Sequence, residues 1–540
     1  MAISNVSRHC AYSLDSWPVF PSLFPMRSLL LACVFSQGIL CCGATLELPV
    51  GFREVLDRPE YKPSHWAFHF VDLATGETLY SLNAEKLMVP ASVTKLFSTA
   101  AVLGEFGATN RFKTHVIQRG ELGPGGVLNG ELILVASGDL TMGGRTDAAG
   151  GIAFRNVDHT YANWTECTEW TEPDPLAGLR ALAKQIGHAG IRSVQGAVLV
   201  DDRLFDSGSS SGSGPSRLSP ILINDNVLDV RVTPTVLGQP ALVEIRPAPS
   251  TWTLDAQVIT STNATTTIRI HQDGDGRVVV RGTILAGGQP LVRIVEVEDP
   301  REFARRLFVE VLEQEGVKVT DDRARAAGSR SNSTMPPREE VRAGKVVATL
   351  ISPPLRDHLR LILKVSHNLH ASTLPMLLAA HHQERTLKAG LRRQAEVLRR
   401  MGLAVESLSF GGGAGGTRSD YVTAKITVDL LRLMMARPDF GDFFDALPVL
   451  GKDGTLASIS KEHPAAGHVR AKTGTLAWDN VLNDTTLLTS KALAGYITAK
   501  SGRRLAFAVF VNGVHHGREL KAKREGEALG RLCEVVWELN

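Results

Sequence analysis

Three short motifs, widely spaced along the chain, constrain its fold most strongly. Ser92-Val-Thr-Lys95 opens a segment whose apolar residues recur at three- and four-residue spacing, which predicts an amphipathic helix. Ser366-His-Asn368 follows much later, and Lys472-Thr-Gly474 lies in an alternating segment that predicts a strand. Roughly 270 residues separate the first two motifs, which is enough for one or two inserted domains. A fold that uses all three motifs must therefore bring a helix and a distant strand together.

The first motif has the residue types of an activated nucleophile. Ser92 is expected in the first turn of the helix, where the helix dipole and backbone N–H groups stabilise an oxyanion. Lys95 is three residues further on the same face, so its amine can reach the serine hydroxyl. A lysine accepts a proton from serine only if its pKa is depressed, and we expect burial and the charge of Lys472 to depress it. An isolated Ser-x-x-Lys is more often a helix N-cap and a solvated lysine, and Ser458-Ile-Ser-Lys461 also has this pattern, so context must decide.

The third motif predicts a substrate-binding strand. The segment from His468 to Thr475 alternates as a strand does, and two further predicted strands follow it as a hairpin. Lys472 and Thr473 present a cation and a hydroxyl, a pair that suits the terminal carboxylate of a peptide. Gly474 is expected to leave room for a substrate backbone along the strand. Together the three motifs indicate a serine acyl-transfer site.

These residues resemble the low-molecular-mass class C penicillin-binding proteins, which are D-alanyl-D-alanine carboxypeptidases and endopeptidases. The resemblance covers most of the chain from about residue 60 onward, including Val198 to Asp202, Leu222 to Asn226 and Asp453 to Leu456. Class A β-lactamases share the motifs but have only a short stretch between the first two. The resemblance implies an α/β fold of the serine β-lactamase and transpeptidase type, in which an antiparallel sheet flanked by helices is interrupted by a large β-rich insertion.

The resemblance also implies a role for each motif residue. Ser92 would attack the carbonyl between the last two D-alanines of a peptidoglycan stem peptide, Lys95 would accept its proton, and Ser366 would relay a proton to the leaving amine. The remaining motif residues would hold the substrate: Asn368, Lys472, Thr473, Gly474 and Thr475. The backbone N–H groups of Ser92 and Thr475 are expected to bind the oxyanion. β-Lactams would mimic the substrate and trap the acyl-enzyme as covalent inhibitors.

Departures from the family pattern leave alternatives open. The run from Gly411 to Gly416 lacks the acidic residue and the serine that relatives usually carry, so we expect a plastic loop or a less active site. His367 stands where relatives often have aspartate, and the stretch from Trp478 to Lys491 is extra. One alternative is a β-lactamase or esterase on the same scaffold, which differs in how fast water releases the acyl group. The other is a cell-wall-binding protein without catalytic activity.

No cofactor and no metal ion is expected. His367 and His370 are three residues apart, but no Cys, Asp or Glu accompanies them at the spacing of a ligand set. The net charge of +3 is too small to imply a nucleic-acid partner. With 43% hydrophobic and 21% charged residues, the chain is neither disordered nor a bundle of membrane spans.

The N-terminus predicts an export signal. Met26, the expected start, begins a pattern of one positive charge, an apolar run from Leu29 to Cys42 and a cleavage site after Ala44. The run is short for a membrane span, and a retained anchor is the alternative. Export would place the protein in the periplasm or cell envelope, with peripheral membrane association and oligomeric state left open. The exported chain would keep only Cys167 and Cys533, too few for a disulfide scaffold.

The chain is expected to divide into four segments. At 540 residues it exceeds what one hydrophobic core usually serves. Residues 1–44 would form the leader, residues 45–112 the first part of the catalytic domain, residues 113–340 the β-rich insertion and residues 341–540 the second part of the catalytic domain.

Overall fold

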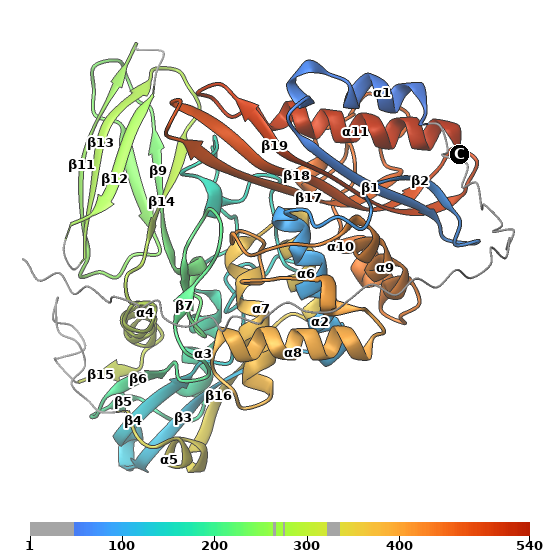
Figure 1. Cartoon of the computed structure of the whole chain (residues 1–540). Helices are drawn as coiled ribbons and strands as arrows, with labels where there is room; N and C mark the ends of the chain where they lie inside the picture. The colour runs from blue at the N-terminus through green and yellow to red at the C-terminus, as the bar shows by residue number, and fades with distance from the viewer. Residues whose placement is uncertain (1–47, 263–265, 274–275, 321–334) are drawn as a thin grey trace, which may run out of the picture. The chain divides into compact units, whose positions relative to one another are not determined.

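A five-stranded antiparallel sheet joins the two ends of the chain. The computed structural model describes residues 48–262, 266–273, 276–320 and 335–540, so the expected leader lies outside the described residues. The strand order is β17-β18-β19-β1-β2, and every neighbouring pair is antiparallel (Figure 1). The strands are β1 (His65–Asp72), β2 (Thr78–Leu82), β17 (Val469–Asn480), β18 (Thr485–Thr498) and β19 (Arg504–His516). The first two and the last three thus come from opposite ends of the sequence.

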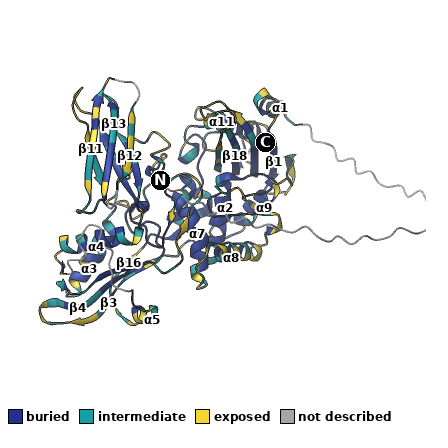
Figure 2. Ribbon diagram, turned by 60° about the vertical axis from the view of Figure 1, so that its left-hand side comes forward, coloured by how far each residue is buried: buried dark blue, intermediate teal, exposed yellow. Residues whose placement is uncertain are grey.

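Helices cover both faces of this sheet because its strands are apolar on both sides. Along β1, Ala67 and Val71 face one hydrophobic core, whereas Phe68 and Phe70 face another. The second core is covered by two helices, α1 (Val50–Leu56) and α11 (Ala522–Leu539) (Figure 1). Figure 2 shows the buried strands of this sheet between its helical layers.

The first core is covered by six helices on the opposite face of the sheet (Figure 1). They are α2 (Thr94–Phe106), α6 (Leu355–Lys364), α7 (Asn368–His381), α8 (Leu387–Arg400), α9 (Ala424–Met435) and α10 (Phe440–Ala446). This arrangement confirms the predicted fold, an antiparallel sheet flanked by helices.

The inserted region contains one mixed sheet in the order β15-β5-β4-β3-β16, in which β6 also pairs with β4. Its strands are β3 (Lys113–Leu122), β4 (Val127–Val135), β5 (Ser193–Val194), β6 (Val198–Asp201), β15 (Lys318–Val319) and β16 (Lys345–Ile351). The sheet packs with α3 (Ala177–His188) and α4 (Pro300–Gln314) in one core. Because β16 pairs with β3, the inserted region extends beyond the predicted boundary at residue 340. The short helix α5 (Arg338–Ala343) precedes this strand.

Two three-stranded sheets and a short hairpin complete the insertion, which is β-rich as expected. The first sheet has the order β10-β9-β14 and the second β11-β13-β12. The strands are β9 (Val227–Thr233), β10 (Leu242–Arg246), β11 (Thr253–Ser261), β12 (Thr267–Gln272), β13 (Arg277–Leu285) and β14 (Leu291–Glu296), and the hairpin is β7 (Gly208–Ser209) with β8 (Arg217–Leu218).

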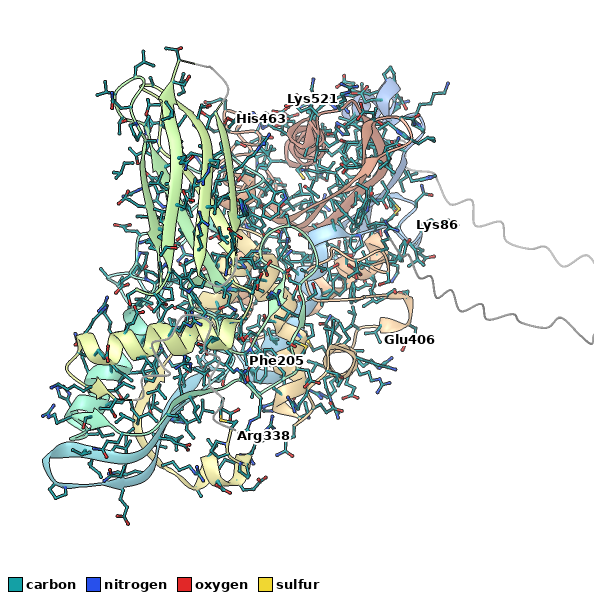
Figure 3. All side chains as sticks on the ribbon, turned by 90° about the vertical axis from the view of Figure 1, so that its left-hand side faces the viewer. Lys86, Phe205, Arg338, Glu406, His463 and Lys521 are labelled. Carbon is teal, nitrogen blue, oxygen red and sulfur yellow. The ribbon has the colours of Figure 1, made fainter. Side chains whose placement is uncertain are left out.

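The insertion is joined to the catalytic part by shared hydrophobic packing. Phe205, which follows β6, is 1% exposed and lies in the core of the catalytic helices (Figure 3). Leu140, Leu218 and Leu222 from the insertion belong to the same core. Packing of this kind fixes the loops of the insertion against the helices that carry the first two motifs.

Two further expectations concern cysteines and membrane spans. Cys167 and Cys533 are both buried free thiols. Among the helices of the described ranges, none is both long and apolar enough to cross a bilayer.

Candidate active site

Ser92 and Lys95 meet at the start of α2. Ser92 lies in the 3-10 turn η2 (Ala91–Val93), which leads directly into this helix. Lys95 is fully buried, and its Nζ lies 2.7 Å from Ser92 Oγ, 2.7 Å from Asn368 Oδ1 and 2.9 Å from the carbonyl oxygen of Ala414. Burial, with a contribution from the charge of Lys472, holds the pKa of Lys95 well below its usual range. The amine therefore lies within reach of the Ser92 hydroxyl, and its lowered pKa allows it to act as a base.

The partners of Lys95 also fix the direction of proton transfer. Asn368 Oδ1 and the Ala414 carbonyl oxygen can only accept hydrogen bonds. The Ser92 hydroxyl is the one partner of the three that can donate. When Lys95 is neutral, its lone pair must therefore face the Ser92 hydroxyl, which is the arrangement that proton abstraction requires.

The second motif lies between α6 and α7. Ser366 has a φ of +64°, in the left-handed region, and this turns the chain sharply before α7 begins. His367 caps α7, because its Nδ1 accepts from the backbone N–H of His370 at 3.3 Å. The Asn368 side chain is therefore not a cap: its Oδ1 accepts from Lys95, and its Nδ2 donates to the carbonyl oxygen of Ser213 at 2.8 Å.

The third motif brings Lys472 to Ser366. Lys472 on β17 is fully buried, and its Nζ donates to Ser366 Oγ at 2.8 Å and to the Thr473 carbonyl oxygen at 2.7 Å. Burial, and to a lesser extent the charge of Lys491, lowers the pKa of Lys472 to about 7. Thr473 Oγ1 donates to Thr455 Oγ1 at 2.7 Å. The structure thus directs the ammonium of Lys472 at Ser366, whereas Thr473 offers its hydroxyl beside it.

Gly474 has a different role from the expected one. A Cβ atom at this position would lie 2.6 Å from the Pro90 carbonyl oxygen and 3.2 Å from Ala91 Cβ. The missing side chain therefore faces the turn that carries Ser92 and not the open side of the strand. Glycine lets β17 pack directly against the turn of the nucleophile, which corrects the expectation that it makes room for substrate.

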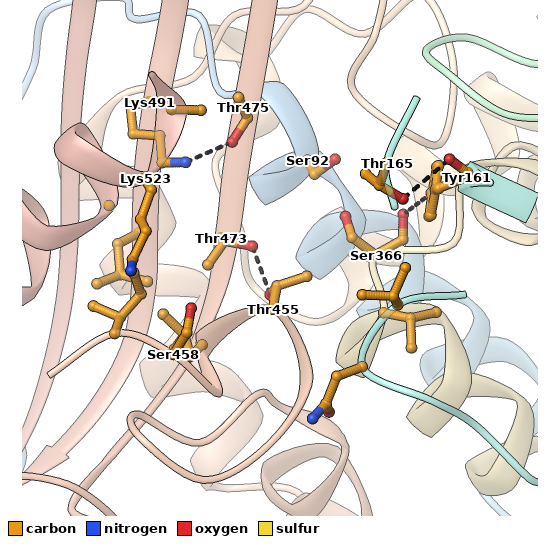
Figure 4. A pocket seen from close by; sticks show the side chains of 18 of the residues that line it. Ser92, Tyr161, Thr165, Ser366, Thr455, Ser458, Thr473, Thr475, Lys491 and Lys523 are labelled. Atoms are coloured by element: carbon orange, nitrogen blue, oxygen red, sulfur yellow. Dashed lines mark hydrogen bonds between the residues drawn. The ribbon is translucent and has the colours of Figure 1, made fainter. Parts of the chain in front are cut away.

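A cavity of about 430 Å³ opens in front of the motif residues. Five of the eight predicted site residues line it: Ser92, Ser366, Asn368, Thr473 and Thr475. Figure 4 shows Ser92 and Ser366 on one side of this cavity and the threonines of β17 on the other. The competing pattern at Ser458 differs, because Ser458 lines the cavity but Lys461 is exposed.

The loop from Gly411 to Gly416 is tightly packed, contrary to the expected plasticity. Its residue Ala414 accepts from Lys95, and the Gly413 carbonyl oxygen accepts from Ser98 Oγ at 2.9 Å. A Cβ atom on Gly413 would lie 2.1 Å from the Ala371 carbonyl oxygen. Buried Asp420 accepts from the backbone N–H groups of Gly411 and Thr417, both at 2.8 Å. Close backbone contacts thus require the glycines, and an acidic side chain still anchors the loop.

Tyr161, from the insertion, reaches the second motif and has no counterpart in the sequence predictions. It lies in the 3-10 turn η4 (His159–Tyr161), and its hydroxyl donates to the Ser366 carbonyl oxygen at 2.6 Å. The Tyr161 hydroxyl oxygen in turn accepts from the backbone N–H of Asn368 at 3.0 Å. One side chain therefore holds the backbone on both sides of His367. A lone tyrosine in a loop gives no sequence signal of such a contact.

A buried cluster of charged groups lies behind Tyr161. Asp225 Oδ2 accepts from Arg145 Nη2 at 2.7 Å and from His159 Nε2 at 3.0 Å, and Asp225 Oδ1 lies 2.6 Å from His370 Nε2. Burial opposes the charge of Asp225, but Arg145 and the histidines hold its pKa well below the usual range. Burial likewise opposes the charge of His159, but Asp229 and Asp225 raise its pKa to about 10. The cluster is a network of compensated charges.

The geometry of the cluster bears on metal binding. Asp225, His367 and His370 are close enough together to hold a metal ion. Three side chains already donate to Asp225, however. The rings of His367 and His370 are stacked with centroids 3.8 Å apart, and their Nε2 atoms lie 3.4 Å and 2.6 Å from the same oxygen, Asp225 Oδ1. The described arrangement is that of a hydrogen-bonded cluster, and the expected absence of a metal remains a prediction.

The fold and the site together define a serine-type acyl-transfer enzyme. The sequence profile of the D-Ala-D-Ala carboxypeptidase 3 (S13) family matches residues 52–530. The chain belongs to this family, and it is a serine-type carboxypeptidase.

The relatives and solved structures agree with this assignment. The chain is 29% identical over 521 residues to a D-alanyl-D-alanine carboxypeptidase of Actinomadura sp. (strain R39), covering 92% of this chain and 86% of the relative. It is 22% identical over 486 residues to the D-alanyl-D-alanine carboxypeptidase DacB of Haemophilus influenzae, covering 85% and 88%. Penicillin-binding protein 4 from Haemophilus influenzae has a similar fold, with a TM-score of 0.66, 18% identity and coverage of 91% of this chain and 99% of that chain.

Proposed function

We propose that the chain is an exported enzyme of the cell envelope that removes the terminal D-alanine from peptidoglycan stem peptides through an acyl-enzyme on Ser92. The observation that carries this proposal is the set of contacts around Lys95, which leave Ser92 as the one hydroxyl able to donate to the amine. The printed names of the relatives, D-alanyl-D-alanine carboxypeptidases, support the substrate class.

Acylation begins with transfer of the Ser92 hydroxyl proton to the neutral amine of Lys95. Ser92 Oγ then bonds to the carbonyl carbon of the penultimate D-alanine, and the backbone N–H groups of Ser92 and Thr475 bind the oxyanion. As the tetrahedral intermediate collapses, the C–N bond breaks and the leaving amine takes a proton from Ser366, and that proton is replaced by the one that Lys95 took from Ser92. Lys472 donates to Ser366 Oγ and so stabilises the charge that develops there.

Deacylation returns the enzyme to its starting state. Water attacks the ester carbonyl and gives a proton to the neutral amine of Lys95. The C–O bond to Ser92 then breaks, Ser92 Oγ takes that proton from Lys95, and the shortened peptide is released. A β-lactam enters by the same route, because opening of its ring also forms an ester on Ser92. In support, penicillin-binding protein 4 of Haemophilus influenzae, which shares the fold, has been solved with a bound β-lactam.

The proposal is tested by measuring D-alanine release from diacetyl-L-Lys-D-Ala-D-Ala with the chain from residue 45 onward. Wild type is expected to release D-alanine, and Ser92→Ala is expected to lose at least about a thousandfold in kcat. Ser458→Ala is the matched control, because Ser458 lines the same cavity and belongs to the competing Ser-x-x-Lys pattern. Equal loss in both variants, or full activity of Ser92→Ala, would contradict the assignment of the nucleophile.

A further inference from the structure

Lys491 lines the cavity that contains Ser92, and no step of the proposed reaction uses it. It lies on β18 directly opposite Thr475 of β17. Its Nζ donates to Thr475 Oγ1 at 2.9 Å, a contact that Figure 4 shows at the side of the cavity. The ammonium is thereby held beside the third motif by a neutral hydroxyl.

Within the described part of the chain, Lys491 has no ion-pair partner. Glu525 is the acid whose charge acts on it, but this carboxylate is paired with Arg524 at 2.6 Å and lies 3.4 Å from His516. Burial lowers the pKa of Lys491 to about 8, and Glu525 opposes that effect. A half-buried ammonium without a counter-ion is costly, and an anion that enters the cavity would offset the cost.

The other lysines near the site are engaged elsewhere. Lys95 and Lys472 form the hydrogen bonds behind Ser92 and Ser366, and neither belongs to the lining of the cavity. Lys523 does line the cavity, but its side chain is 67% exposed and lies 3.7 Å from Glu527. Lys491 is therefore the cation that the described structure presents to a ligand beside the threonines of β17.

We propose that Lys491 binds the terminal carboxylate of the substrate together with the hydroxyls of Thr473 and Thr475, and so selects peptides that end in a free carboxylate. The inference rests on the proposed function and assigns a substrate contact within the same site. A charge-assisted hydrogen bond to a carboxylate is about twice as strong as a neutral one. A site built in this way rejects an uncharged C-terminus, because the ammonium would then stay unpaired.

The test compares two peptides that differ only at the C-terminus: diacetyl-L-Lys-D-Ala-D-Ala and its C-terminal amide. Wild type is expected to prefer the free acid in kcat/KM, and Lys491→Met is expected to reduce that preference about 10- to 100-fold, mainly through KM. Lys491→Arg should retain most of the preference because it keeps the charge. Lys523→Met is the matched control and should leave the preference unchanged. An undiminished preference in Lys491→Met would overturn the inference.

A binding measurement separates this inference from the proposed function. Calorimetry on Ser92→Ala, with and without Lys491→Met, gives the affinity for each peptide without turnover. The inference requires that Ser92→Ala binds the free acid more tightly than the amide and that Lys491→Met removes the difference. Equal affinities in Ser92→Ala would refute it. If wild type releases no D-alanine while the binding preference depends on Lys491, the proposed function fails and the carboxylate site stands.

Discussion

Replacement of Gly415 by alanine tests how the glycine loop holds the catalytic base. Gly415 has a φ of +87°, and a Cβ atom there would lie 1.9 Å from the carbonyl oxygen of Ala91. Ala91 directly precedes Ser92, and Ala414 directly precedes Gly415 and accepts from Lys95. One added methyl group therefore presses on the turn of the nucleophile and on the carbonyl that positions the base.

The unfolding free energy lost in Gly415→Ala is the sum of two separable costs. An alanine in the left-handed region costs about 1–2 kcal/mol, and a forced contact in a well-packed region costs a further 1–3 kcal/mol or so. Gly502 provides a matched control, because its φ is +91° and a Cβ atom there would meet nothing within 4 Å. Gly502→Ala should therefore carry only the first cost, and the difference between the variants, about 1–3 kcal/mol, isolates the contact.

The assay is urea unfolding combined with stopped-flow acylation by benzylpenicillin. We expect Gly415→Ala to lose more unfolding free energy than Gly502→Ala and to be acylated about tenfold more slowly or worse, since 1.4 kcal/mol in the barrier is a factor of ten. Gly502→Ala should be acylated at the wild-type rate. Equal stability losses and equal acylation rates in the two variants would refute the packing argument.

Three further predictions concern the groups around the second and third motifs. Tyr161→Phe removes the hydroxyl that joins Ser366 to Asn368. Because water can enter from the cavity, we expect the free-energy barrier to acylation to rise by about 1–3 kcal/mol, which slows acylation roughly 5- to 150-fold. Asp225→Asn breaks a buried charge network and should lower the unfolding free energy by about 3–5 kcal/mol in urea titrations. The pKa of Lys472 is about 7 in the folded chain and 10.5 for an ordinary lysine, so the unfolded chain binds more protons between these pH values and stability should rise with pH across that window. Urea titrations at pH 7, 8 and 9 should show the rise, and Lys472→Met should flatten part of it.

Surface variants supply the controls. Tyr421→Phe alters a partly exposed tyrosine and Asp484→Asn an exposed acid paired with Arg518, so each should change stability by less than about 1 kcal/mol. Acylation of Tyr161→Phe at the rate of Tyr421→Phe would show that the tyrosine does not position the motif. An Asp225→Asn protein as stable as Asp484→Asn would show that the cluster is not a compensated network.

The three predicted motifs meet in one site of the structure, and local spacing in the sequence is enough to place their residues on a helix and a strand. The spacing of three positions from Ser92 to Lys95 places both on one helix face, and the alternation around Lys472 predicts a strand whatever its neighbours are. The order of the motifs and the long separation between them also predict the interrupted fold. The roles assigned to these residues remain predictions until they are tested by substitution.

The contacts that complete the site depend on tertiary structure and give no local signal. Tyr161 and Asp225 come from separate loops of the insertion, and nothing in their own segments shows that they converge on Ser366 and His370. The role of Gly474 was predicted incorrectly for the same reason, since only the packed structure shows which side of the strand meets Pro90. The end of the insertion was placed too early because β16 is defined by its pairing with β3, far away in sequence.

Intact-mass analysis after incubation with benzylpenicillin tests the central claim most directly. We expect an adduct of one penicillin on the wild-type chain, mapped by peptide digestion to Ser92, retained in Ser458→Ala and absent in Ser92→Ala. An adduct on another residue, or no adduct with the penicillin recovered intact, would contradict the catalytic assignment. Rapid hydrolysis of penicillin without a lasting adduct would instead identify a β-lactamase on this scaffold.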